Sequence, residues 1–453
     1  RISSDRAKVK IILGSDSIYH PGLEMKLLKK KRELTFFRTN EGIAKSPFFS
    51  SFHQVDMFFE QLTWVRGDTT MDIKMISGGG LNKATFESFN YFKDWRYEKI
   101  QGLSDRSPLI DLRNFAQKQN SKTFYIEDFA NYKRLPLSEV KILLISLSIQ
   151  GFVSYDTDND QVVINDKLNF YINSKFQKSD FDVIDFESKV SGKLNAKLSL
   201  TNYNLNIQGV DFVSLSDSQN VFIRPSKREI VLKGNRDFAF GGNVFAGRFE
   251  FYGKDFYFHY KDFKIDLNNV DSLRFKVPIS PDSLDANGNP KLIVVKSVIE
   301  HITGNVLIDI PTNKSGRFNY PNYPIFNSLK ESWVYYDKPS IFKGVYDRSK
   351  FFFHLDPFTI DSLDNFTAAG LTFNGELVSA NIFPTFKDTL KLQKDYSLGF
   401  IRNTPEEGFP AYKGKGKYTS EIRLSNQGLR GTGTLDYLVS QGKSHDFMFF
   451  PDS

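Results

Sequence analysis

From about residue 190 onward, the chain repeats one kind of segment, a short run rich in Phe, Tyr, Val and Ile followed by Gly, Asn, Asp or Ser. The runs recur about every 8–12 residues, which is the spacing of antiparallel strands joined by turns. Within 255–260 and 263–267 the apolar side chains alternate with polar ones, so each strand buries one face. These side chains are Phe256, Phe258, Tyr260, Phe263, Ile265 and Leu267. The pattern predicts a mainly β chain of serial short antiparallel or solenoid-like strands, as a sandwich, barrel, jelly roll or solenoid.

The aromatic content supports the same fold class. The 453 residues include 45 Phe and 20 Tyr, which fit the pleated and half-buried surface of a strand. Such an excess could line an apolar groove for a lipid. Buried aromatic side chains also dominate the energetics of ordinary cores, and this second interpretation is favoured.

The first 105 residues contain shorter strand candidates, at 8–13, 34–38 and 71–76, separated by turn-forming residues. The run Ser77-Gly78-Gly79-Gly80 interrupts them. It is not followed by Lys-Ser/Thr at the spacing of a phosphate-binding P-loop, so it predicts a turn. We expect residues 1–105 to form a β-rich region.

Residues 106–170 have a different pattern. Apolar side chains recur at helical spacing in 110–119, 126–133 and 138–150, with Ser138 as the expected N-cap of the third helix. Alternating residues at 152–155 and 161–164 then predict a hairpin. This order of helices and wing resembles winged-helix domains over about 55 residues, and the resemblance depends on pattern rather than on a motif.

The composition of this insert does not favour DNA binding. Its third helix carries a single cation, Lys141, and is apolar on nearly every side. A recognition helix needs side chains that reach phosphates and bases. The expected wing carries three acids that would repel phosphate, namely Asp156, Asp158 and Asp160. We therefore expect a packing or protein-interaction role and no nucleic-acid partner.

A cluster of Pro, Asn and Gly between Pro278 and Pro290 predicts a boundary between two further β-regions. The expected division is a β-rich region (1–105), an insert (106–170), a β-domain (171–280) and a second β-domain (281–453). The sequence begins with Arg1 and ends directly after a strand-like run at 447–450. We expect the chain to be part of a longer protein.

The charge is mildly basic, with 60 Lys and Arg against 53 Asp and Glu and a net charge of +7. The densest basic run, Lys29 to Arg32, is short and predicts a solvated turn or strand face. Cysteine is absent, which excludes disulfides, thiolate metal sites and a Cys nucleophile. There is no run of 18 apolar residues, so we expect no transmembrane segment in this sequence.

No catalytic, cofactor-binding or metal-binding residue is predicted. The six His lie too far apart in sequence for a helical zinc pair, and no GxSxG nucleophile motif occurs. The runs 156–160 and 285–289 place Asp and Asn at alternate positions but lack the rest of a calcium loop, so both predict turns. Trp64, Trp95 and Trp333 could stack on sugars, although the strand-like surroundings of Trp333 favour burial in the core.

These observations favour a non-enzymatic structural or scaffold part of a large bacterial cell-envelope or surface protein, periplasmic or extracellular. Its expected partners are other protein subunits or further domains of the same chain. Two alternatives stay open. One is a β-module that binds glycan or lipid through an aromatic groove, and the other is a β-rich enzyme that acts on polysaccharides through an acidic pair.

Overall fold

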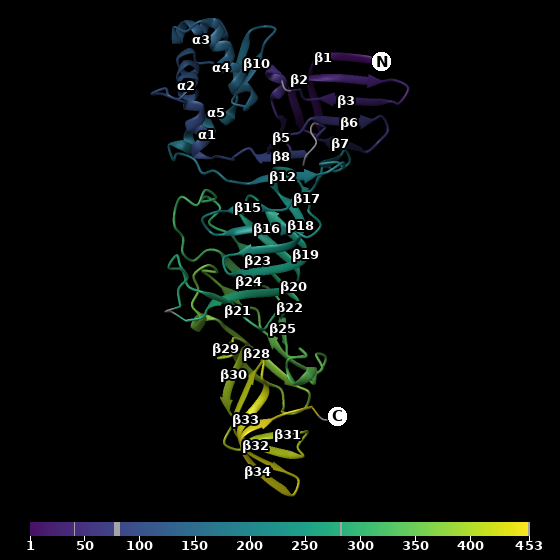
Figure 1. The fold of residues 1–453 in the computed structure, drawn as a ribbon, viewed down its shortest axis with the longest axis vertical. Coiled ribbons are helices and arrows are strands. Elements are labelled where there is room, and N and C mark those ends of the chain that lie inside the picture. Colours follow the sequence, from purple (N-terminus) through teal and green to yellow (C-terminus); the bar gives the residue numbers. More distant parts are fainter. Residues whose placement is uncertain (40, 77–81, 281–282, 452–453) are drawn as a thin grey trace.

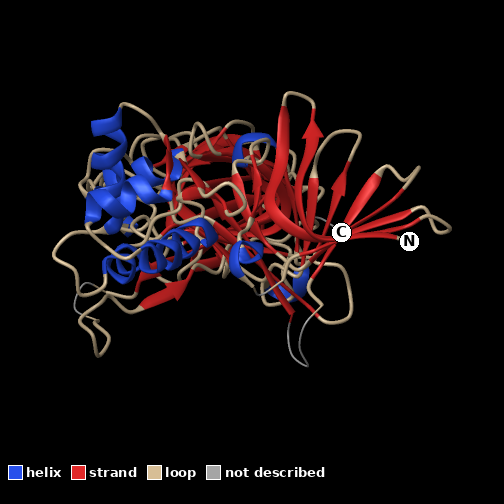
Figure 2. Cartoon of the chain, turned by 90° about the horizontal axis from the view of Figure 1, so that it is seen from above, coloured by secondary structure: helices blue, strands red, loops and turns tan. Residues whose placement is uncertain are grey.

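The computed structural model describes residues 1–39, 41–76, 82–280 and 283–451. It is mainly β, with 48% strand and 14% helix, which confirms the predicted fold class. Figure 1 shows a long β-body that carries a compact helical insert beside its N-terminal strands. Seen from above in Figure 2, the helices of the insert gather on one side of the strands.

The β-body begins with a sheet that branches at β2. Its C-terminal half pairs with β3 and its N-terminal half with β4, so two branches, β3–β6–β7 and β4–β5–β8, leave the same strand. The strands expected at 8–13, 34–38 and 71–76 lie in β1, β3 and β7, whereas the Ser77–Gly80 break falls outside the described residues. The strands are β1 (Ile2–Leu13), β2 (Asp16–Leu28), β3 (Glu33–Phe37), β4 (Phe48–Ser50), β5 (Val55–Phe58), β6 (Gln61–Val65), β7 (Thr70–Lys74) and β8 (Asn82–Ser88).

The first branch continues through β13, β14 and β17 to β18, and the second continues to β12. β18 pairs with β17 near Phe238 and with β16 from Gly242 onward. The pairing register with β19 shifts between these two halves, which bends the strand. Gly242 sits at this bend with φ +136°, and a Cβ there would lie 2.3 Å from the carbonyl oxygen of Arg224. The strands of this part are β12 (Asp185–Val190), β13 (Ala196–Ser199), β14 (Leu205–Gln208), β15 (Val213–Ser216), β16 (Val221–Pro225), β17 (Glu229–Leu232), β18 (Phe238–Ala246), β19 (Phe249–His259) and β20 (Lys264–Pro278).

Beyond β20 the antiparallel pairing continues from strand to strand towards β34. One branch passes through β23, β24 and β27, and the other through β22, β25, β26, β28, β29, β30, β32 and β33. The strands are β21 (Leu292–Val294), β22 (Ile299–Glu300), β23 (Ile302–Leu307), β24 (Ile325–Ser328), β25 (Ser332–Tyr335), β26 (Phe351–Leu355), β27 (Thr359–Ile360), β28 (Thr372–Ser379), β29 (Phe386–Leu392), β30 (Leu398–Asn403), β31 (Phe409–Ala411), β32 (Gly416–Ser425), β33 (Gly428–Tyr437) and β34 (Ser440–Met448).

A single hydrophobic cluster fills the β-body from Val9 in β1 to Phe449 after β34. Aromatic rings pack against one another across it, for example Phe238 on Phe258 with ring centroids 4.7 Å apart and Phe251 on Phe326 at 4.8 Å. The Phe residues that alternate in β19 therefore serve as core. This cluster crosses the expected boundary at Pro278–Pro290 without interruption, so the division into 171–280 and 281–453 stays a prediction.

The insert has its own hydrophobic cluster, separate from that of the β-body. The helices expected at 110–119, 126–133 and 138–150 are present, and the hairpin is joined by a third strand, β9, that was not expected. The third helix begins after Pro136, so Ser138 is not its N-cap. Further helices lie on either side of 106–170. The elements are α1 (Asp94–Gln101), α2 (Pro108–Gln119), β9 (Thr123–Tyr125), α3 (Ile126–Lys133), α4 (Leu137–Ile149), β10 (Val153–Asp156), β11 (Gln161–Ile164) and α5 (Asp166–Lys175).

One local expectation is wrong. Trp333 does not point into the core, since Ser332 and Val334 occupy the buried positions of β25 and leave it half-buried on the outer face. The apolar pattern there is right for a strand, but it does not reveal which face of the strand is buried.

Candidate functional site

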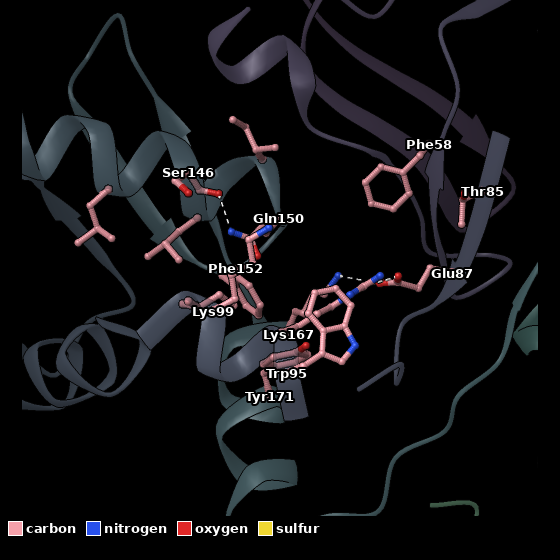
Figure 3. A pocket seen from close by; sticks show the side chains of 15 residues that line it. Phe58, Thr85, Glu87, Trp95, Lys99, Ser146, Gln150, Phe152, Lys167 and Tyr171 are labelled. Atoms are coloured by element: carbon pink, nitrogen blue, oxygen red, sulfur yellow. Dashed lines mark hydrogen bonds and ion pairs between the residues drawn. The ribbon is translucent and has the colours of Figure 1, made fainter. Parts of the chain in front are cut away.

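A cavity lies where the insert meets the β-body. It has a volume of about 610 Å³, within the range of small-molecule sites. Side chains from α1, α4 and α5 of the insert line one side, and those of β5 and β8 line the other (Figure 3). Three of the lining residues, Leu147, Phe152 and Tyr171, belong to the hydrophobic core of the insert, so the cavity borders that core.

The helices present their cavity residues at helical spacing. Leu143 and Leu147 of α4 and Gln150 at its C-terminal end lie on one face, as do Trp95 and Lys99 of α1. Leu147 also belongs to the insert core together with Leu144, so the cavity face of α4 adjoins its core face. The cavity wall formed by α4 is thus largely apolar.

The floor of the cavity is a buried network of charges. Lys167 of α5 pairs with Asp56 of β5 and lies 3.8 Å from Glu87 of β8, and the three side chains are 7%, 4% and 4% exposed. Arg96 of α1 completes the network, donating to Glu87 over 2.6 Å. Figure 3 shows Lys167 and Glu87 of this network between insert and body. Two cations and two carboxylates balance one another there.

Electrostatics keep both cations charged. Burial alone would lower the pKa of Lys167, but the carboxylates of Asp56 and Glu87 outweigh that effect, so this pKa is raised. Burial also opposes the charge of Arg96, yet Glu87 raises the Arg96 pKa. The Tyr171 hydroxyl beside them stays neutral, because burial raises its pKa well above the ordinary value. The two cations therefore keep their charge at neutral pH, whereas burial raises the pKa of Asp56 and Lys167 opposes that rise.

This arrangement suits binding better than proton transfer. Each carboxylate on the floor already contacts a cation, whereas a general acid or base needs a proton that can leave. Lys99, Ser146 and Gln150 lie among the apolar lining residues and supply further polar groups. The indole of Trp95 is 57% exposed.

Two further contacts fasten the insert to the β-body. Arg6 of β1 binds the wing through Asp158 at 2.8 Å and Thr157 at 3.0 Å. The hydroxyl of Ser46 donates to the carbonyl of Ser148 at the end of α4 over 3.3 Å. The acidic wing thus faces a basic strand of the same chain.

The other sequence candidates lie elsewhere. In the run 156–160 the carboxylate of Asp156 accepts from the backbone of Asp158 and Asn159, and Asp285 makes the same kind of turn in 285–289. No group of three His, Asp or Glu that could hold a metal occurs within residues 1–39, 41–76, 82–280 and 283–451. Of the six His, His20 and His53 are fully buried.

The basic run 29–32 forms the turn between β2 and β3. Among the tryptophans, Trp64 donates its indole N–H to the carbonyl of Asp68, Trp95 lines the cavity and Trp333 lies on the outer face of β25. Only Trp95 is therefore part of the site described here.

Sequence reasoning missed the charge network. Lys167 and Asp56 are 111 residues apart, and only the fold brings them together. One signal was present: Asp56 stands between Val55 and Met57 in a strand in which all three side chains are buried. An acid at such a position needs a buried partner.

No protein-family model, curated protein or solved structure matches this chain. The site is therefore interpreted from its own geometry. Across the described ranges, no helix combines the length and apolar character needed to cross a membrane.

Proposed function

We propose that this chain is a non-enzymatic structural part of a large bacterial cell-envelope or surface protein, periplasmic or extracellular, in which it acts as a scaffold. The observation that carries the proposal is the single hydrophobic cluster that runs through the whole β-body. Through the middle of the body the strands lie across the long axis, so their hydrogen bonds run along it (Figure 1). A body built in this way resists bending and stretching along its length.

The partners proposed for such a scaffold are other subunits or further domains of the same polypeptide. β1 pairs with β2, and β34 pairs with β33. In the part of the chain that the structure describes, neither strand has a second neighbour. An unpaired strand edge is the usual place where a further strand is added.

Cell fractionation and complementation test the scaffold proposal. The tagged chain is expected in the envelope fraction, and its deletion is expected to weaken the envelope against detergent. A Phe258→Ala chain should fail to complement in proportion to its lost stability, whereas the exposed Lys118→Gln chain should complement fully. A cytosolic location, or release of sugars from envelope polysaccharide by the purified chain, would contradict the proposal.

A second candidate function, glycan binding, is favoured by aromatic rings on the outer face of β25 and β26. Trp333 packs on His354 with ring centroids 5.3 Å apart, and His301 meets its edge at 5.8 Å. Glu331 lies 3.2 Å from His354 and adds a hydrogen-bond acceptor. Sugar rings stack on such surfaces through their C–H faces. Calorimetric titration of envelope polysaccharides against the native chain and a Trp333→Ala variant tests this, since only the native chain should bind.

A further inference from the structure

The cavity between insert and β-body has an unequal distribution of charge. Three cations line it, Arg96, Lys99 and Lys167. Two carboxylates, Asp56 and Glu87, balance Arg96 and Lys167 at the floor. Among the residues that the structure describes, Lys99 has no carboxylate within 4.0 Å, so the cavity keeps one uncompensated positive charge.

The rest of the cavity wall is mostly apolar. Leu143 and Ile149 of α4 face it from the insert, Phe58 of β5 faces it from the body, and Phe152 closes it near the floor. Trp95 adds a largely exposed aromatic face. An indole in this setting gains by packing against an apolar partner, because its exposed surface then leaves water.

The fold explains why this space exists. The insert and the body each complete a hydrophobic core of their own, and their junction combines the Lys167–Asp56 ion pair with separate ring contacts such as Phe89 on Phe170. A junction built from separate contacts fills space less completely than a continuous core does. Apolar groups left over at the edge of each core then line the gap.

We infer that the cavity binds a small amphipathic carboxylate, an apolar body of about ten carbon atoms with one negative headgroup. The apolar body lies between α4 and Trp95, and the carboxylate pairs with Lys99. The volume of about 610 Å³ is sufficient for one such molecule. This inference is independent of the scaffold proposal, because a scaffold can carry a ligand or lack one.

The test uses the full chain with Trp64 and Trp333 replaced by Phe, so that fluorescence reports Trp95 alone. Decanoate is titrated below its micellar concentration, with decyltrimethylammonium as the probe of equal length and opposite charge. Decanoate is expected to shift Trp95 emission saturably at one molecule per chain. The cationic probe is expected to bind at least about tenfold more weakly, since it meets an excess of positive charge.

Three variants locate the binding. Lys99→Gln is expected to weaken decanoate binding about threefold, the size of an exposed ion pair. Lys118→Gln removes the same charge from α2 outside the cavity and should leave the affinity unchanged. Ser146→Phe places a ring in the cavity from an exposed position and should abolish binding, while circular dichroism and the unfolding midpoint stay as in the parent chain.

The inference is supported if decanoate binds saturably and the binding is lost in Ser146→Phe. Binding should also be weakened in Lys99→Gln and unchanged in Lys118→Gln. Equal affinity for both probes, binding that does not saturate, or binding that survives Ser146→Phe overturns it. If the Ser146→Phe chain is destabilised, Leu143→Phe, which adds no second tryptophan, fills part of the same cavity and takes its place.

Discussion

The β-body and the insert bury their apolar side chains in different ways. The body buries alternate side chains of antiparallel strands in one cluster that extends along its whole length. The insert closes five helices and a three-stranded sheet around a small cluster of its own. Each is complete without the other, so their junction is made by the buried charge network and by contacts such as Arg6 to Asp158. The comparison therefore predicts that the two regions, each with its own hydrophobic cluster, unfold as distinct cooperative units.

The largest expected effect on stability comes from truncating a large buried side chain in either core. Phe258→Ala should destabilise the β-body by about 3–5 kcal/mol, and Leu144→Ala the insert by about 2–5 kcal/mol, because each leaves a cavity. Trp333 lies in β25 and Trp95 in α1, so single-tryptophan chains report the two regions separately during urea unfolding. Each substitution is expected to move only the transition of its own region. A shift of both transitions by either substitution would show that the two cores unfold as one.

The charge network is the next target. Lys167→Met leaves Asp56 without its cation and should destabilise the attachment of the insert by about 3–5 kcal/mol. The measurement is the urea midpoint reported by Trp95. In the double variant Lys167→Met, Asp56→Leu most of that loss should be recovered, because a buried pair replaced by apolar side chains is often neutral. A double variant as unstable as the single one would contradict the role given to this pair.

Acid should weaken the β-body through two histidines that are buried in neutral form. The ring of His20 donates from Nε2 to the carbonyl of Ser46 and accepts at Nδ1 from the backbone of Gly22, so it has no place for a second proton. Burial, with help from Arg38, lowers the pKa of His20 to about 3. Burial likewise lowers the pKa of His53 to about 4.

The direction of the pH effect on the free energy of unfolding follows from these pKa shifts. Below about pH 6.5 the unfolded chain binds protons at both positions and the folded chain does not, so stability falls as the pH drops. Each histidine should account for about 1.4 kcal/mol per pH unit between about pH 6 and pH 4. Asp185 acts in the opposite direction, since burial and the nearby Glu187 raise its pKa to about 6. Urea unfolding from pH 7 to pH 4 measures the net slope, which His53→Gln should flatten and Asp185→Asn should steepen.

The smallest effect is expected at the wing. Arg6 and Asp158 are 55% and 74% exposed, and exposed pairs contribute about 0–1 kcal/mol. A double-mutant cycle with Arg6→Ala and Asp158→Ala, read from the Trp95 transition, should give a coupling in that range that vanishes at high salt. A larger coupling energy that persists at high salt would show that the insert is attached mainly through the wing and not through the charge network at the floor of the cavity.

The sequence predicts the helices and strands better than the tertiary contacts between them. Alternation at Phe256, Phe258 and Tyr260 and the helical spacing around Leu144 predict strands and helices correctly, because those patterns are local. Trp333 was assigned to the wrong face of its strand, since Val334 and Trp333 are both apolar and periodicity alone does not choose between them. The cavity floor was missed because Lys167, Asp56 and Glu87 come from distant segments.

Native-state hydrogen exchange in increasing denaturant tests the central claim most directly. The amides of β12 to β30 are expected to open together at one free energy, across the Pro278–Pro290 segment. The amides of α2 to α4 should open at a lower free energy of their own, and Lys167→Met should lower theirs alone. A single opening shared by strands and helices would contradict the account, as would a β-body that opens separately on the two sides of residue 280.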